Sequence, residues 1–185
     1  MLRSWHNRRA RSSTWEKIDL VLSTSTDEYL DILDNFQSPF NVGTVVNMED
    51  FSLEHLKELN QKYKSPFTLS ELEQLIDLLR GHPYLTRKAM YEVSLGNYSA
   101  TELFAQAYAD GGPFGDHLRS IILYRIGSRP DLISAMQNVV QSQNVNDIQA
   151  FWQLKGAGLV EGSVNKVVWR RKLYQLFFEQ YLGVM

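Results

Sequence analysis

The pattern of apolar and polar positions changes near residue 48. Before that point, residues 17–23 and 40–48 are short runs rich in Ile, Leu and Val, which is typical of buried strands. The stretch between them is polar and turn-like at both ends. Two strands alone make an unstable sheet. We therefore expect the first part of the chain to be the edge of a sheet whose other strands lie outside this sequence.

After residue 50 the apolar positions follow helical spacing instead. Ser52 is a candidate N-cap just before the first of these patterns. Thr68 and Glu71, and again Ser99 and Glu102, have the spacing of a capping box. In a capping box each partner's side chain binds the backbone N–H of the other. These signals predict about four short helices joined by tight turns.

One joint between two predicted helices has no loop. A helical pattern runs through Leu79 and stops at Gly81, a residue suited to the left-handed backbone that often follows a helix. Pro83 comes next but one, and proline is favoured in the first turn of a helix because its missing N–H costs nothing there. Local rules therefore predict a tight corner at Gly81-His82-Pro83.

The remainder of the chain predicts a second helical region with a hairpin. Residues 109–116 concentrate Gly and Pro and are the best linker candidate. Three helical patterns follow, the first capped by Asp116, and we expect Phe151 and Trp152 of the third to be in the core. A hairpin with Gly162 in its turn and a final amphipathic helix complete the pattern. Helix, helix, helix, hairpin is the order of a winged helix. The predicted fold class is mainly α with a minor β part, and the predicted domains are 1–48, 49–112 and 113–185.

Composition sets broad limits on function. The 44% hydrophobic and 12% aromatic residues are enough for a packed core. The 19 basic and 21 acidic residues nearly cancel, so bulk attraction to nucleic acid or to a membrane is not indicated. There is no cysteine, which excludes disulfides and thiolate metal sites and fits an intracellular, cytoplasmic protein. No apolar run reaches the roughly 18 residues that span a bilayer.

Searches for catalytic motifs find no candidate. The sequence has no G-x-x-x-x-G-K-[ST] loop for phosphates, no G-x-S-x-G nucleophile motif and no H-E-x-x-H zinc motif. The four histidines are not spaced four residues apart on a helix, as a pair of metal ligands would be. We therefore predict no catalytic residue and no metal site in this chain.

A basic cluster at the predicted wing is a candidate contact surface. Two interpretations stay open: the cations bind DNA phosphates, or the wing docks on another protein surface. Polar side chains of the preceding helix, Gln149, Gln153 and Lys155, would then read the bases. The candidate nucleic-acid or partner contacts are Lys166, Arg170, Arg171 and Lys172.

Five segments, taken in order, resemble the C-terminal half of the bacterial AAA-like ATPase domains. They are residues 15–30, 37–59, 79–93, 110–126 and 151–178, which together cover nearly the whole chain. That family is related to the STAND signalling NTPases and to archaeal ATPases similar to origin-recognition proteins. In such proteins a P-loop core is followed by a helical lid and a winged helix.

The resemblance assigns roles to two places in the chain. Ser25, after the first apolar run, falls at the polar sensor-1 position of the core. Many STAND relatives carry an arginine there, and Ser25 cannot supply that charge. Gly81-His82-Pro83 matches the G-x-P motif at the start of a lid helix, where the flat proline ring packs on adenine. The resemblance thus implies cofactor-binding positions at Gly81, His82, Pro83 and Ser25.

The resemblance also implies what this sequence lacks. The P-loop and the strand with the Mg²⁺-binding acids are expected upstream, on the same or another chain. We therefore expect ATP or ADP to bind in the complete parent protein, and neither to bind tightly nor to be hydrolysed by this chain alone. The implied function is a nucleotide-dependent signalling switch. Its partners would be the P-loop core and an effector or sensor domain, with DNA less favoured and no membrane.

The alternative function comes from a different class. The chain would be a standalone helical and winged-helix module that binds DNA or another protein. The salt dependence of nucleic-acid affinity would separate the two, because contacts to phosphates weaken steeply as salt rises.

Overall fold

The computed structural model describes residues 4, 7–19, 21, 23, 44, 46 and 48–182, without the side chains of residues 123 and 125. The chain forms two compact units, Met1–Met48 and Glu49–Met185. In the first unit, a 3-10 turn, η1 (Arg9–Arg11), precedes a four-residue helix, α2 (Ser13–Glu16).

The two strands predicted in the first unit are not confirmed. Their described residues, among them Ile18, Val21 and Val46, belong to no strand. Val21 and Val46 are 96% and 76% exposed, whereas a strand in a sheet interior would bury them. The physical reason is that an apolar run needs a partner strand or a covering helix to become a buried strand. The rest of both stretches lies outside the described residues, and so does Ser25.

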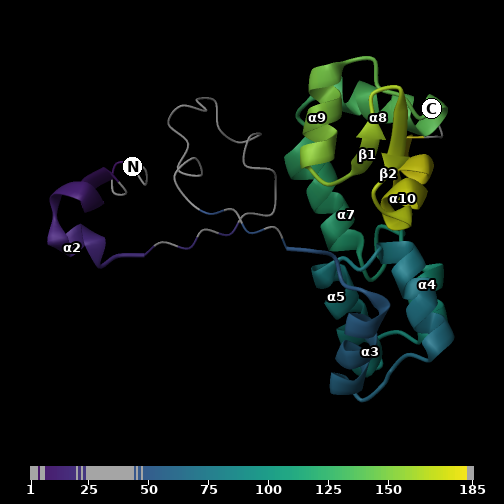
Figure 1. The fold of residues 1–185 in the computed structure, drawn as a ribbon. Coiled ribbons are helices and arrows are strands. Elements are labelled where there is room, and N and C mark those ends of the chain that lie inside the picture. The colour runs from purple at the N-terminus through teal and green to yellow at the C-terminus, as the bar shows by residue number, and fades with distance from the viewer. Residues whose placement is uncertain are drawn as a thin grey trace. The chain divides into compact units, whose positions relative to one another are not determined.

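The second unit is mainly helical, which confirms the predicted fold class (Figure 1). Its two short strands pair antiparallel, with Val160 opposite Trp169 and Ser163 opposite Lys166. The elements in chain order are α3 (Leu53–Lys62), α4 (Leu69–Leu79), α5 (Pro83–Ser94), α6 (Ala100–Ala105), α7 (Gly115–Ile121), the π-helical η4 (Ile122–Ile126), α8 (Pro130–Ser142), α9 (Ile148–Gly156), β1 (Val160–Ser163), β2 (Lys166–Trp169) and α10 (Lys172–Leu182).

Helices at the two ends of this unit share one hydrophobic core. Figure 1 shows α3, α4 and α5 at one end, α8, α9 and the hairpin at the other, and α7 and α10 between them. A single cluster of buried side chains runs from Leu56 of α3 to Leu182 of α10. Phe114, in the stretch expected to be a linker, is fully buried within that cluster. The predicted boundary after residue 112 stays a prediction, but the chain there is packed.

Three of the predicted helix starts are confirmed in detail. Thr68 and Glu71 form the capping box of α4, and Ser99 and Glu102 form that of α6. Ser52 caps α3, with His55 in the position that Glu takes in the other two. The His55 Nδ1 accepts a hydrogen bond from the Ser52 N–H at 3.2 Å.

Three predictions for the later helices and the hairpin are wrong. Phe114, not Asp116, is the N-cap residue of α7, because the buried Phe114 fixes where that helix begins. Gly162 lies within β1 and not in the turn, which is formed by Val164 and the residue after it. Trp152 is 55% exposed, because the neighbouring elements cover only the other side of α9, where Phe151 is 2% exposed.

None of the described helices is both long and apolar enough to cross a lipid bilayer.

Candidate functional site

The Gly81-His82-Pro83 corner follows a left-handed turn of the backbone that is tightly packed at Gly81. Helix α4 ends at Leu79, and the next two residues take left-handed conformations, with φ of +50° at Arg80 and +73° at Gly81. A Cβ on Gly81 would overlap the carbonyl oxygen of Phe51. The Phe51 N–H donates to the Gly81 carbonyl at 2.7 Å, so the two backbones are held together. Glycine is therefore required here by both conformation and space.

Pro83 is the first residue of α5, as predicted. It is partly exposed, and Tyr84 beside it is 55% exposed. The His82 side chain makes no capping hydrogen bond to the first turn of α5. This leaves an accessible proline ring and an accessible tyrosine ring on a rigid corner.

An aromatic cluster joins the corner to two later helices. The ring centroids of His82 and His117 lie 5.6 Å apart, and that of Tyr84 lies 6.0 Å from His117. His117, on α7, stacks on Tyr174 of α10 at 5.9 Å, and its Nε2 lies 3.0 Å from the Tyr174 hydroxyl. The corner is thus in direct contact with α7 and, through His117, linked to α10.

Two of the predicted basic contacts are held by acids of this same unit. Arg171 is 5% exposed, and its guanidinium donates to Asp50 at 2.7 Å. Arg170 lies 3.6 Å from the other Asp50 oxygen and 3.8 Å from Glu161. Burial lowers the pKa of Arg171, whereas the charges of Tyr174 and Asp50 act to raise it. Asp50, just before α3, therefore anchors the junction between β2 and α10.

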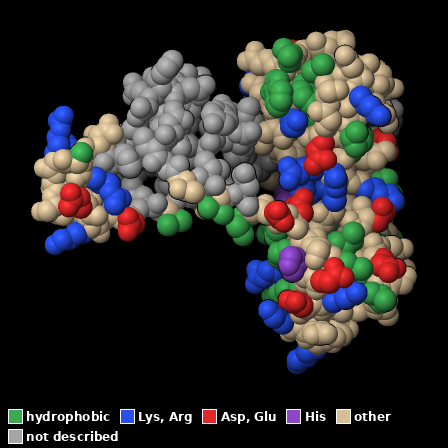
Figure 2. All heavy atoms as spheres, in the orientation of Figure 1, with side chains coloured by type: hydrophobic (Ala, Val, Ile, Leu, Met, Phe, Trp, Pro, Cys, Tyr) green, Lys and Arg blue, Asp and Glu red, His purple; other side chains and the backbone are tan. Residues whose placement is uncertain are grey.

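Arg80 extends this network to the corner itself. Its guanidinium donates to Glu161 of β1 at 2.7 Å and to the Arg170 carbonyl at 3.4 Å. Lys172 of α10, a third member of the predicted basic cluster, donates to Asp77 of α4 at 2.6 Å. Figure 2 shows basic and acidic side chains interleaved across the middle of this unit.

Lys166 differs from the other three predicted contacts. It is exposed on β2, and its ammonium pairs with no acid in the part of the chain that the structure describes. On the same end of the unit, Ile148 and Trp152 of α9 are 63% and 55% exposed. The Lys155 ammonium lies 4.9 Å from the centre of the Trp152 ring, a cation–π contact.

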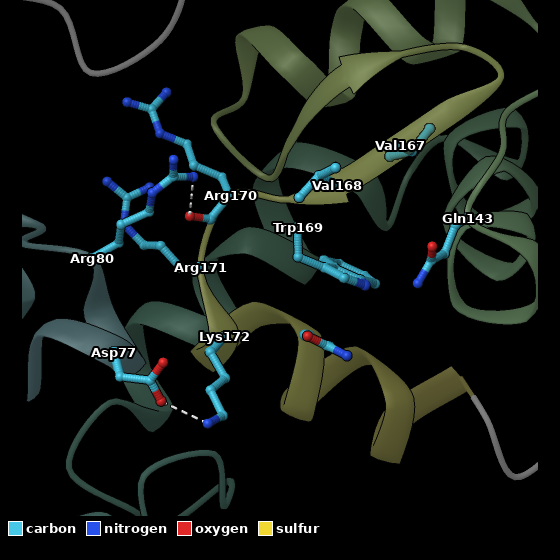
Figure 3. A pocket seen from close by; sticks show the side chains of 10 residues that line it. Asp77, Arg80, Gln143, Val167, Val168, Trp169, Arg170, Arg171 and Lys172 are labelled. Carbon is cyan, nitrogen blue, oxygen red and sulfur yellow. Dashed lines mark hydrogen bonds and ion pairs between the residues drawn. The ribbon is translucent and has the colours of Figure 1, made fainter. Parts of the chain in front are cut away.

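A groove of about 360 Å³ opens beside the ion-pair network. Figure 3 shows Arg80, Arg170 and Arg171 close together on one side of it and Trp169 and Gln143 on the other. The lining residues come from α4, the end of α8, β2 and the first turn of α10: Asp77, Arg80, Gln143, Val167, Val168, Trp169, Arg170, Arg171, Lys172 and Gln175.

The structure brings the predicted site residues together only in part. Gly81, His82 and Pro83 form one corner, and Arg170 and Arg171 reach it through Arg80, while Lys166 is elsewhere on the hairpin. Asp50 and Glu161 could not be found from the sequence, because they are scattered acids with no motif. His117 and Tyr174 carried only the weak signal of a histidine and a tyrosine in predicted helices. Among the described residues, no group of three His, Asp or Glu side chains is arranged to hold a metal ion.

The model of a protein family described as the AAA-like domain matches residues 1–180. No curated protein and no solved structure matches the chain.

Proposed function

Because the chain belongs to the AAA-like domain family, we propose that it is the C-terminal part of a nucleotide-dependent, STAND-type molecular switch. In this proposal the Gly81-His82-Pro83 corner forms the adenine side of a site for ATP or ADP. Ser25 provides the sensor-1 position, and residues 113–185 form a winged helix that relays the nucleotide state to an effector or sensor domain. The phosphate-binding loop and the Mg²⁺-binding acids come from a P-loop core.

The observation that carries the proposal is the direct contact between the corner and the C-terminal elements. His82 touches His117 of α7, and Arg80 is hydrogen-bonded to Glu161 of β1. A base pressing on the corner would therefore displace side chains that already touch the hairpin region and α7. Coupling between two sites needs such a continuous set of packed and hydrogen-bonded groups.

The chemistry of the corner suits an adenine ring. Pro83 offers a flat, apolar ring with no N–H that needs a partner, and Tyr84 offers a second ring for stacking. The hydrogen bond between the Phe51 N–H and the Gly81 carbonyl holds the backbone that leads into Pro83 before any ligand binds. A preformed surface loses less conformational entropy on binding than a flexible one.

Adenosine titration followed by two-dimensional ¹H–¹⁵N NMR tests the adenine side of the site. We expect weak, saturable shifts in the backbone amides of His82, Tyr84 and Leu85. The Pro83→Ala variant should weaken those shifts, because a methyl group offers far less flat surface than the proline ring.

The control is the set of amides around Trp152 and Lys166 on the far hairpin and helix, which adenosine should not shift. Shifts that are absent at the corner, or unchanged after Pro83→Ala, would rule out the assignment of the corner. Uridine at the same concentration shows whether adenine is preferred.

We also expect no ATP hydrolysis by this chain alone, since it has no P-loop motif and no expected Mg²⁺-binding acids. Release of phosphate from ATP, measured with purified protein across several independent preparations, is the readout. Turnover that follows the protein through every purification step would contradict the proposal.

The alternative, a DNA-binding or protein-interaction module, is favoured by one observation: Ile148 and Trp152 of α9 and Lys166 of the hairpin are all exposed. Acids pair with Arg170, Arg171 and Lys172, so this network has too little net positive charge to bind the several phosphates of a DNA duplex. Fluorescence anisotropy of a labelled duplex at several salt concentrations separates the two. Affinity that falls steeply with salt and is lost in Lys166→Gln would support the DNA version.

A further inference from the structure

We propose that the groove between α4, β2 and the start of α10 binds a phosphate group. The lining carries four cations, Arg80, Arg170, Arg171 and Lys172, and one acid, Asp77, so its formal charge is +4 − 1 = +3. Asp50 and Glu161 lie beside the lining and pair with its arginines. With these two included, the total is +4 − 3 = +1, and the network lacks one negative charge.

Unsatisfied hydrogen-bond donors of Arg170 and Arg171 also indicate that the network lacks a negative group. The Nε atoms of Arg170 and Arg171 are buried and have no hydrogen-bond acceptor among the described residues, and that of Arg170 has only the ion pair with Glu161 at 3.8 Å. Arg171 as a whole is 95% buried, given its 5% exposure, and Asp50 is the acceptor of its guanidinium. A buried donor without an acceptor destabilises the fold. An additional anion in the groove would offset the surplus charge.

The start of α10 adds a second source of positive potential. The helix begins at Lys172, and its first turn contains no acidic residue. The first N–H groups of a helix have no partner within it, and together with the helix dipole they favour an anion. Lys172 and Gln175 of this turn both line the groove. The cations and the helix start therefore face one space.

The accessible donors match a phosphate. The side chains of Arg80, Arg170 and Lys172 are 56%, 37% and 52% exposed, so their terminal nitrogens can reach a ligand. Guanidinium groups bind phosphate oxygens in pairs, and lysine adds a point charge. Trp169, whose other face stacks on Phe178 at 5.8 Å, forms an apolar wall beside these donors.

The groove is larger than a single phosphate ion needs, so a phosphate with an attached organic group also fits. Free phosphate and a phosphate ester would offer the same oxygens to these cations, and the experiment separates them. The inference does not rest on the proposed function, because its donors are the side chains of Arg80, of the β2–α10 junction and of Lys172, and not the ring of Pro83.

The experiment titrates inorganic phosphate, ADP and adenosine separately into the protein at constant ionic strength. Two-dimensional NMR follows the arginine Nε–H signals and the backbone amides of Lys172 and Leu173. We expect saturable shifts of these signals with phosphate and with ADP, and none with adenosine. Tighter binding of ADP identifies an ester as the ligand, and equal or tighter binding of phosphate identifies the free ion.

Two variants test the assignment to the groove. Lys172→Gln should raise the Kd for phosphate about threefold to tenfold, since one charge-assisted contact is lost. Arg80→Gln should do the same from the other wall. Lys166→Gln is the matched control: it removes one cation from the same hairpin, outside the groove, and should leave the Kd unchanged.

The absence of saturable shifts with both phosphate and ADP would overturn the proposal. An equal effect of Lys166→Gln and Lys172→Gln would also overturn it, because it would show general charge screening and not a site. Shifts by adenosine at the corner alone would support the proposed function while leaving the groove without a ligand, so the two failures are distinguishable.

Discussion

Helices α3, α4 and α6 begin with reciprocal side-chain caps, whereas α7 and α8 begin without any side-chain cap. In the first group the residues that fix the start of each helix are three positions apart. In the second group, α7 follows directly on Phe114, whose ring is fully buried in the shared core, and Arg119 of that helix holds the preceding Asp110 at 2.8 Å. Among α3 to α6 only α5 lacks a side-chain cap, and among α7, α8 and α9 only α9 has one, from Asp147. Local sequence therefore specifies more of the helix starts before residue 112 than after it.

The largest expected loss of stability is at Gly81, which is constrained both by its own backbone conformation and by contact with the distant Phe51. Gly81→Ala should lower the free energy of unfolding by about 3 kcal/mol or more, because it adds both a strained φ and an overlap with the Phe51 carbonyl. Urea denaturation measures the loss.

Gly96→Ala is the matched control for that variant. Gly96 has a similar φ of +76°, but a Cβ there would meet nothing within 4 Å. Its cost should be only the backbone strain, about 1–2 kcal/mol. Equal losses in the two variants would show that Phe51 does not constrain the corner and that local sequence alone determines it.

The next effect tests the contact that joins the two regions. Arg171→Met should cost about 2 kcal/mol, because it removes a buried cation and leaves Asp50, 28% exposed, without its nearest partner. A double-mutant cycle with Asp50→Asn isolates the interaction from the other effects of each substitution.

Lys172→Met with Asp77→Asn provides the comparison pair. These side chains are 52% and 64% exposed, so their coupling should be about 0.5 kcal/mol and should fade as salt is raised. If the two cycles gave the same coupling energy, burial of Arg171 would not be what holds the C-terminal region to α3.

A smaller effect separates a true cap from a predicted one. Thr68→Ala should cost about 1 kcal/mol, since the first turn of α4 loses its hydrogen bond to the Thr68 hydroxyl. Asp116→Asn should change stability by less than about 0.5 kcal/mol, since Asp116 makes only surface ion pairs. Chemical denaturation of both variants is the measurement, and a larger loss for Asp116→Asn would reverse the contrast between the regions.

The smallest effect concerns the charge of a capping residue. Hydrogen bonds from the Ser99 hydroxyl, and then from its backbone N–H, lower the pKa of Glu102. A lowered carboxyl pKa stabilises the fold above the unfolded-state pKa, and this contribution is lost as pH falls through the folded-state pKa. Ser99→Ala should raise the Glu102 pKa toward its usual value, as measured by ¹³C NMR titration. No change in that pKa would mean that the cap at α6 is not formed in solution.

The contrast between the regions also explains which features could be predicted. The capping boxes and the Gly81–Pro83 corner could be read from residues a few positions apart, because each depends on local backbone geometry. The hairpin could not be placed correctly, since its register is fixed from outside: the Val145 N–H donates to the Val164 carbonyl at 2.9 Å, and the Val167 N–H donates to the Gln143 carbonyl at 2.8 Å. These bonds draw the turn past Gly162, which a local rule would have chosen.

The candidate site shows the same limit. Gly81 and Pro83 carried a local signal, whereas the acids that hold Arg170 and Arg171 did not. Asp50 lies 121 positions from Arg171 in the chain, so no spacing rule relates them. A basic run followed by a helix indicates free cations only when no carboxylate elsewhere in the fold can reach it.

The burial of Phe114 has a practical consequence for anyone who would divide this protein. A cut in the Gly- and Pro-rich stretch would pull an aromatic ring out of the core and leave each fragment with an uncovered apolar face. The fragments should therefore be insoluble apart, and in scanning calorimetry the intact unit should melt in one peak whose van't Hoff and calorimetric enthalpies agree.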